Sequence, residues 1–273
     1  MTSRISMLFN WAGLALLGTA GSIALVLEAG AQTASDPFAN YCRADAPITI
    51  FLIDQTEAYD EVDRTRLAEG AIAVMNGLWA GERFEIYTLD NKPGNITPRV
   101  SLCIPGCPEE YSRATPIWQQ RCNRVVIERD KRGFQALFAQ TMRAYLNAGQ
   151  ATPATELLRT LSQLSGEFRG RNLRKLVIFS DMIEYSSLSR RVAGFGEKDI
   201  DPLLTRAARE ASPGETFRGV PTEAFGFGKW LGQLDKPDRA DLPFPASQAI
   251  RVFWERYFTE LAGAASIRVT LNY

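Results

Sequence analysis

The chain has 273 residues, 45% of them hydrophobic, which is enough to bury a sizeable core in one large domain or two small ones. Lys and Arg together number 31, as do Asp and Glu, so the formal net charge is zero and we expect no nucleic-acid partner. The absence of histidine excludes Ser-His-Asp and Cys-His catalysis and HExxH zinc sites. Any chemistry must come from carboxylates, hydroxyls, Lys, Tyr or Cys.

The N-terminus carries an uncharged apolar run, residues 5–27, directly after Arg4. Ala29 and Ala31 then form the small-x-small pattern that precedes signal-peptidase cleavage, so residues 1–31 are expected to be a signal peptide. The run is also long enough for a retained transmembrane anchor, because about 20 residues span a bilayer. A buried core helix is the third alternative, although a run without a polar face is unusual for one. Both export alternatives place the rest of the chain outside the cytoplasm, for example in the periplasm, and leave this segment as its sole membrane contact.

All four cysteines (Cys42, Cys103, Cys107 and Cys122) follow the apolar run. An even number in an oxidising compartment predicts two disulfides, with three pairings open. A zinc site made by the four thiolates is the alternative. The spacing lacks the paired C-x2-C motifs typical of such sites, which favours disulfides.

The elements alternate between strands and helices along the chain. Residues 32–47 predict a linker and 48–273 a single domain, in which we expect a buried strand at 48–53, a helix from Asp60 to about Leu78, and an antiparallel pair of strands within 83–104. Next we expect a disulfide-stapled loop over 105–129, followed by a helix from 134. A second helix should begin near Thr152 or Pro153. After it we expect a basic, solvated run over 168–175 and a strand over 175–181. A charged region over 184–216, a strand over 222–228, a helix capped by Ser247 and a final strand complete the domain.

This alternation is typical of an α/β fold, here a doubly wound, mostly parallel, Rossmann-like sheet with helices on both faces. The strands within 83–104 add one antiparallel hairpin near an edge of the sheet.

Oxygen-bearing side chains follow the predicted strands. Asp54 and Thr56 come directly after the first strand, Thr152 begins a helix, and Asp181 follows the strand over 175–181. Ligands of open α/β sheets bind at the carboxyl ends of the parallel strands, so these groups are expected to converge. Carboxylate and hydroxyl oxygens suit Mg²⁺, which keeps several waters. The alternative is that the aspartates only stabilise turns and that Thr152 only caps a helix.

This order of motifs resembles the von Willebrand factor type A (VWA) domain over about residues 48–265. That family has Asp-x-Ser-x-Ser after its first strand, a Thr after a Gly-rich turn, and an Asp after its fourth strand. Here "DQTEA" (54–58), "GQATP" (149–153) and "FSDMIE" (179–184) occupy those places. The resemblance implies a VWA-type sheet and a metal-ion-dependent adhesion site. Ala58 lacks the second hydroxyl and Met182 stands where the family usually has Gly, so the site is degenerate.

The resemblance, with the lack of histidine, implies a non-enzymatic binding module without catalytic residues, and the N-terminal segment implies that it is exported or membrane-tethered. A protein partner would bind at the carboxyl end of the sheet, where an acidic residue of that partner could complete a Mg²⁺ shell. A metal-free structural subunit of an envelope assembly is one alternative. A Mg²⁺-dependent phosphoester hydrolase using Asp54, Asp181 and Glu184 is another. The hydrolase is disfavoured because Thr56 interrupts the Asp-x-Asp pattern of haloacid-dehalogenase-type phosphatases.

Overall fold

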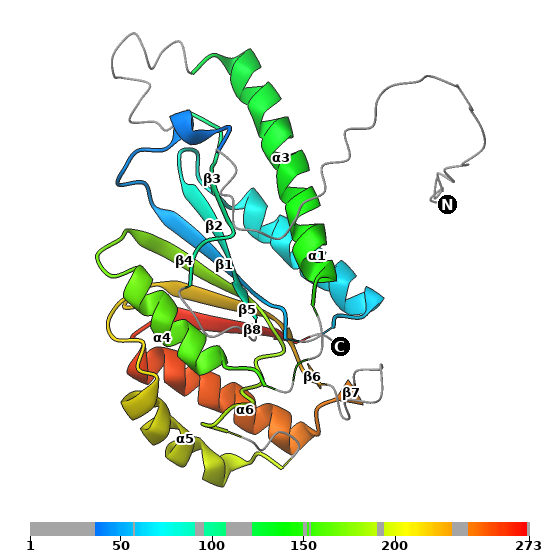
Figure 1. Ribbon diagram of the computed structural model, residues 1–273, viewed down its shortest axis with the longest axis vertical. Helices are drawn as coiled ribbons and strands as arrows, with labels where there is room; N and C mark the ends of the chain where they lie inside the picture. The colour runs from blue at the N-terminus through cyan, green and yellow to red at the C-terminus, as the bar shows by residue number, and fades with distance from the viewer. Residues whose placement is uncertain are drawn as a thin grey trace, which may run out of the picture. The chain divides into compact units, whose positions relative to one another are not determined.

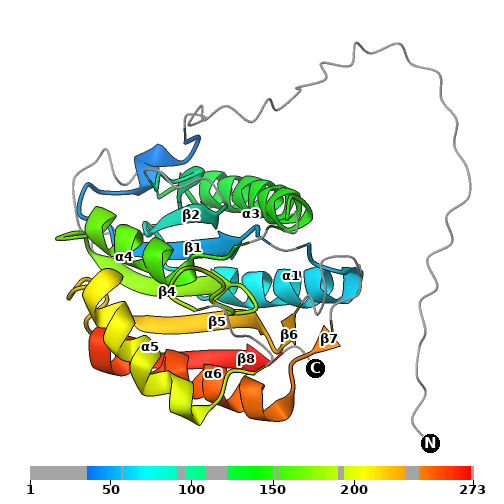
Figure 2. The same ribbon diagram turned by 60° about the horizontal axis from the view of Figure 1, so that its bottom comes forward.

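A six-stranded sheet organises the folded part of the chain, in the order β3-β2-β1-β4-β5-β8 (Figures 1 and 2). The structure is a computed structural model that describes residues 36–56, 58–90, 96–107, 122–149, 152, 154–189, 194–230 and 240–271. These residues belong to one unit, Thr33–Tyr273. The predicted signal peptide or membrane anchor, residues 1–31, lies outside them. In the described part of the chain, no helix is long and apolar enough to cross a membrane.

The sheet is parallel except at one edge. Its strands are β1 (Ile48–Asp54), β2 (Arg83–Leu89), β3 (Val100–Cys103), β4 (Leu173–Phe179), β5 (Pro221–Phe227) and β8 (Ser266–Leu271). Only β3 is antiparallel, and it pairs with β2. The prediction of an α/β fold with a mostly parallel sheet and one antiparallel edge pair is therefore confirmed. A separate small ribbon, β6 (Lys229–Trp230) with β7 (Ala240–Asp241), follows β5.

The first strand is central because its sequence is apolar on both faces. All seven residues of β1 are buried, and the strand pairs with β2 on one side and β4 on the other. A parallel strand covered on both faces requires such a continuous apolar run. Asp54, at its C-terminal end, is therefore carried into the interior by the strand that it ends.

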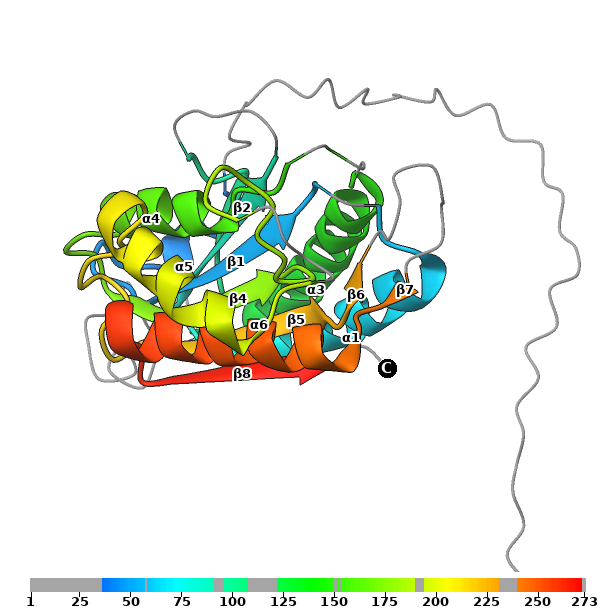
Figure 3. The same ribbon diagram turned by 90° about the horizontal axis from the view of Figure 1, so that it is seen from below.

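Helices cover both faces of the sheet, as Figures 1 and 3 show. One face packs against α1 (Glu61–Asn76) and α3 (Arg124–Asn147), with an aromatic cluster that includes Phe51, Phe84 and Phe138. The other face packs against α4 (Leu157–Glu167), α5 (Glu197–Glu210) and α6 (Phe244–Arg256), which continues into the π-helical turn η3 (Tyr257–Leu261). The doubly wound arrangement follows from the apolar residues that each strand presents on alternate faces.

The segment just before β1 packs on the domain. Its short helix η1 (Ala39–Tyr41) places the Tyr41 hydroxyl 2.8 Å from the carboxylate of Asp130 on α3. Cys42 forms a disulfide with Cys103 at the end of β3. The described part of the predicted linker, residues 36–47, is thus fixed to the edge of the sheet.

A second disulfide joins Cys107 to Cys122, so the prediction of two disulfides is confirmed and the pairing is resolved. Residues 108–121, between these two cysteines, lie outside the described residues. Disulfides persist in oxidising compartments, so the two bridges are consistent with a location outside the cytoplasm.

Four helices differ from the sequence prediction. Helix α4 begins at Leu157, four to five residues after the start expected near Thr152 or Pro153. Helix α3 begins at Arg124, ten residues earlier than expected, because the Asn123 side chain accepts hydrogen bonds from the first turn. Helix α6 begins at Phe244, so Ser247 lies buried inside it and is not its cap. Helix α5 was not predicted at all. Its apolar stripe (Ile200, Leu203, Leu204 and Ala207) is hidden among charges and interrupted by Pro202.

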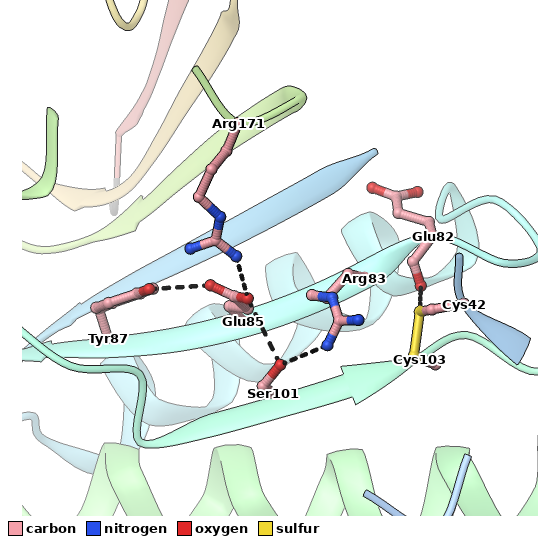
Figure 4. A network of polar contacts seen from close by, with 8 residues as sticks. All are labelled: Cys42, Glu82, Arg83, Glu85, Tyr87, Ser101, Cys103 and Arg171. Atoms are coloured by element: carbon pink, nitrogen blue, oxygen red, sulfur yellow. Dashed lines mark hydrogen bonds and ion pairs between the residues drawn. A yellow bond between two sulfur atoms is a disulfide. The ribbon is translucent and has the colours of Figure 1, made fainter. Parts of the chain in front are cut away.

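The basic run 168–175 is not simply solvated. Arg171 lies 2.7 Å from the buried carboxylate of Glu85, which also accepts a hydrogen bond of 2.9 Å from Tyr87 (Figure 4). Arg174 lies 2.8 Å from the fully buried carboxylate of Glu82. Both pairs lie at the N-terminal end of β2, where they compensate buried charge.

Candidate functional site

Side-chain oxygens from three segments meet at the C-terminal end of β1 and β4. The two strands are parallel neighbours, with Ile53 opposite Phe179, so they end at the same edge of the sheet. Asp54 ends β1, while Ser180 and Asp181 follow β4. The segment before α4 supplies a third set of oxygens. The cluster therefore lies where ligands of open α/β sheets bind.

Asp54 is buried, with 2% of its surface exposed, and both of its carboxylate oxygens accept hydrogen bonds. Oδ1 accepts from the backbone N–H of Thr56 at 2.9 Å and from the Thr56 hydroxyl at 2.6 Å. Oδ2 accepts from the Ser180 hydroxyl at 2.7 Å. Two hydroxyls and one backbone N–H, rather than cationic side chains, thus hold this carboxylate in place.

Thr155, rather than Thr152, places its hydroxyl in the cluster. Its Oγ1 lies 2.7 Å from the Oγ1 of Thr56. Because the Thr56 hydroxyl donates to Asp54, the Thr155 hydroxyl must be the donor of this pair, which leaves its own lone pairs for another ligand. The hydroxyl of Thr152 instead donates to the carbonyl of Ala154 at 2.7 Å, while its N–H donates to the Thr56 carbonyl at 2.8 Å.

Sequence reasoning missed Thr155, although "TPAT" offers two threonines at a spacing of three. The choice between them depends on the backbone of the loop, which the spacing does not reveal. Ser180 was also missed, because the prediction considered only Asp181, the next residue, as a ligand from this strand end.

Asp181 is equally buried, and its Oδ1 accepts a hydrogen bond of 2.9 Å from the N–H of Ile183. The next residue, Met182, has a φ of 62°, in the left-handed region that favours glycine. Its carbonyl accepts a hydrogen bond of 2.6 Å from the Trp254 indole on α6. A methionine in this conformation costs about 1 kcal/mol. Surrounding contacts thus hold Met182 in a backbone conformation that the residue itself disfavours, as often occurs at functional sites.

The surroundings of Asp54 disfavour its ionised form. Burial, followed by the negative charge of Asp181, raises the pKa of Asp54 to about 6, while hydrogen bonds from Thr56 and Ser180 offset part of the rise. A cation between the two carboxylates would relieve this repulsion.

Tyr59 fixes the two strand ends relative to each other. Its hydroxyl lies 2.8 Å from the carbonyl oxygen of Asp54 and 3.1 Å from that of Phe179. Ala58 is exposed and contributes no oxygen, and Glu57 lies outside the described residues. On the rim, Tyr185 is 42% exposed and pairs through its backbone with Thr155. The Tyr59 hydroxyl thus links the two strand ends, and the half-exposed Tyr185 lies next in the chain to Glu184 and pairs with Thr155.

These residues fit a hard divalent cation in donor type, because all the side chains of the cluster offer oxygen. Among the described residues, no three His, Cys, Asp or Glu side chains form a group that could hold a metal ion. The set here is instead two carboxylates with the hydroxyls of Thr56, Thr155 and Ser180. It suits an ion that retains water rather than one enclosed by carboxylates.

No protein-family model and no curated protein matches this chain. A likeness of fold does not itself define an activity, so the chemistry of the oxygen cluster is the stronger indication of function.

Proposed function

We propose that the chain is a non-enzymatic, protein-binding module of the VWA type that acts outside the cytoplasm. The observation that carries the proposal is the convergence of Asp54, Thr56, Thr155 and Asp181 at the C-terminal end of a doubly wound sheet. The strand order 3-2-1-4-5 with a final parallel strand, in which β3 alone is antiparallel, supports the VWA resemblance. The two disulfides support an oxidising compartment.

In this proposal Thr56 and Thr155 would hold a Mg²⁺ or Mn²⁺ ion directly, and the two aspartates would balance its charge. The cation would supply an electropositive point for an acidic residue of the partner. The exposed ring of Tyr185 would contact the partner beside that point. No residue of the cluster is assigned a catalytic role.

The decisive experiment is a thermal melt of oxidised residues 32–273 in EDTA and in 5 mM MgCl₂ or MnCl₂. A cation that binds only the folded state raises the melting temperature by mass action. We expect a rise of several degrees in the wild-type chain and none in Asp54→Ala. Asp201→Asn, which changes a carboxylate on α5 whose side chain is 80% exposed, is the matched control and should retain the rise. No rise in the wild-type chain with either ion would reject the metal site.

A metal-free structural subunit is the second candidate, and specific contacts favour it. Both carboxylate oxygens of Asp54 already accept hydrogen bonds from the protein. The Thr152 hydroxyl donates to the carbonyl of Ala154, and the side chain of Ala58 has no oxygen to offer. Recovery of a partner in Mg²⁺ and its loss in EDTA would support the first proposal. Recovery of the same partner in EDTA and with Asp54→Ala would support the structural subunit.

A further inference from the structure

Glu184 is a buried carboxyl that follows β4 and lies outside the oxygen cluster, with 6% of its surface exposed. We propose that Glu184 is a positioning residue: it caps α4 from the neighbouring loop and thereby fixes Thr155 relative to Asp181. This inference rests on the proposed cation site, for which it names the residue that holds two ligand loops together.

The first observation is the N-terminus of α4. Residue Glu156 occupies the capping position there but makes no side-chain capping hydrogen bond. Instead, Oε2 of Glu184 accepts a hydrogen bond of 2.9 Å from the N–H of Leu158. The first N–H groups of a helix have no partner within it, and a carboxylate is a favourable one. The α4 helix therefore begins against a side chain supplied by a different loop.

The second observation is the backbone pairing beside this contact. The N–H of Thr155 donates to the carbonyl of Tyr185 at 2.8 Å, and the N–H of Tyr185 donates to the carbonyl of Thr155 at 2.9 Å. With the bond to Leu158, three hydrogen bonds join residues 155–158 to residues 184–185. Because Thr155 is one of the residues held by these hydrogen bonds, they also determine the position of its hydroxyl next to Thr56.

The third observation concerns how the carboxyl is held. The hydroxyl of Ser186 donates to Oε1 of Glu184, so both carboxyl oxygens are engaged. A cavity of about 20 Å³, large enough for one water molecule, is lined by Glu184 together with Met182 and Trp254. Close packing is thus incomplete on that side, and hydrogen bonds fix the carboxyl. Loss of these bonds should loosen the loop before it unfolds the domain.

The test compares Glu184→Ala with Glu184→Gln, which keeps the size of the side chain and one oxygen acceptor. Leu102→Ala, in β3 on the opposite face, is the control for a general loss of stability. Mn²⁺ affinity is measured by calorimetric titration at a temperature where all variants are folded. Amide hydrogen exchange is followed at Leu158 and Tyr185 in the same samples.

We expect Glu184→Ala to weaken Mn²⁺ binding roughly ten-fold, the size usual for residues that orient metal ligands, and to accelerate exchange at both amides. Glu184→Gln should largely restore both properties, and Leu102→Ala should lower the melting temperature without changing the affinity. Unchanged affinity in Glu184→Ala, or an equal loss in Leu102→Ala, would overturn the positioning role. If the wild-type chain bound no Mn²⁺, the proposed function would fail. The contact between residues 155–158 and 184–185 would then be tested by amide hydrogen exchange alone. Unchanged exchange at Leu158 and Tyr185 in Glu184→Ala would overturn the role of Glu184 in that contact as well.

Discussion

The two ends of the central strands bury carboxylates in opposite ways. At the N-terminal end of β2, Glu82 and Glu85 lie 2.8 Å and 2.7 Å from arginine side chains. At the C-terminal end of β1, Asp54 is held by hydroxyls and an N–H, and the charge of Asp181 helps to raise its pKa to about 6. Charge at the first end is compensated within the chain. At the second end, burial and the nearby charge of Asp181 both disfavour the ionised form of Asp54.

The largest expected effect comes from breaking the compensated end. Arg174→Met leaves Glu82 buried without its cation, and should lower the free energy of unfolding by about 3 kcal/mol, as for other broken buried pairs. Urea denaturation measures this change. Arg43→Met, at an exposed pair with Asp45, is the control and should change stability by less than about 1 kcal/mol. Equal effects of the two variants would show that the buried pair is not what stabilises this end.

Next in size is the pH dependence caused by Glu184. Burial, partly offset by the hydrogen bond from Ser186, raises the pKa of Glu184 in the folded chain to about 7, from an ordinary value near 4.5. A raised carboxyl pKa means that the folded state binds the extra proton. This contribution is fully present below about pH 4.5 and is lost as pH rises through about 7. Stability should fall by on the order of 3 kcal/mol across that window. Glu184→Gln should flatten the fall in urea titrations between pH 4 and 8, and an unchanged slope would contradict the assignment.

A smaller effect, of opposite sign to that of Arg174→Met, is expected at the C-terminal end of β1. Asp54→Asn removes a charge that burial, and next the charge of Asp181, disfavour, and should raise the free energy of unfolding in EDTA at pH 8 by about 2 kcal/mol. The gain should vanish near pH 4, where Asp54 is already protonated. Stability measured in EDTA at both pH values checks this. A loss of stability at pH 8 would mean that the fold itself requires the carboxylate.

The smallest expected effect separates two threonines of one loop. Thr155→Val should weaken Mn²⁺ binding roughly ten-fold, about 1.4 kcal/mol, because it removes the hydroxyl next to Thr56. Thr152→Val removes a hydroxyl that bonds to the carbonyl of Ala154, and should leave the affinity nearly unchanged. Calorimetric titration of the two variants tests the choice. A larger loss of Mn²⁺ affinity in Thr152→Val than in Thr155→Val would show that Thr152, not Thr155, supplies the ligand.

The sequence predicted the sheet well because its strands are apolar runs with clear boundaries. The β1 run ends abruptly at Asp54, and the β4 run ends just before Asp181. Helix α5 escaped prediction because its apolar stripe lies among charges, and helix α6 began earlier than Ser247 indicated.

The site was only partly predictable for a different reason. Asp54, Thr56 and Asp181 follow strands, so the strand ends fixed their places. The role of Thr155 depends on the pairing of its loop with Tyr185, a contact between segments 30 residues apart. The neutralisation of Glu85 by Arg171 is a contact of the same kind, between residues 86 positions apart.

The disulfide between Cys42 and Cys103 has a mechanical consequence. It fixes the segment before β1 at the end of the sheet opposite Asp54, so a force applied between that segment and the C-terminal edge of the sheet would act lengthwise on β1. Hydrogen bonds to β2 and β4 run along both sides of that strand and would have to break together under shear. The disulfide diverts part of the tension into β3 before it reaches Ile48. A force applied at Cys42 would therefore be shared between β3 and β1 rather than carried by Ile48 alone.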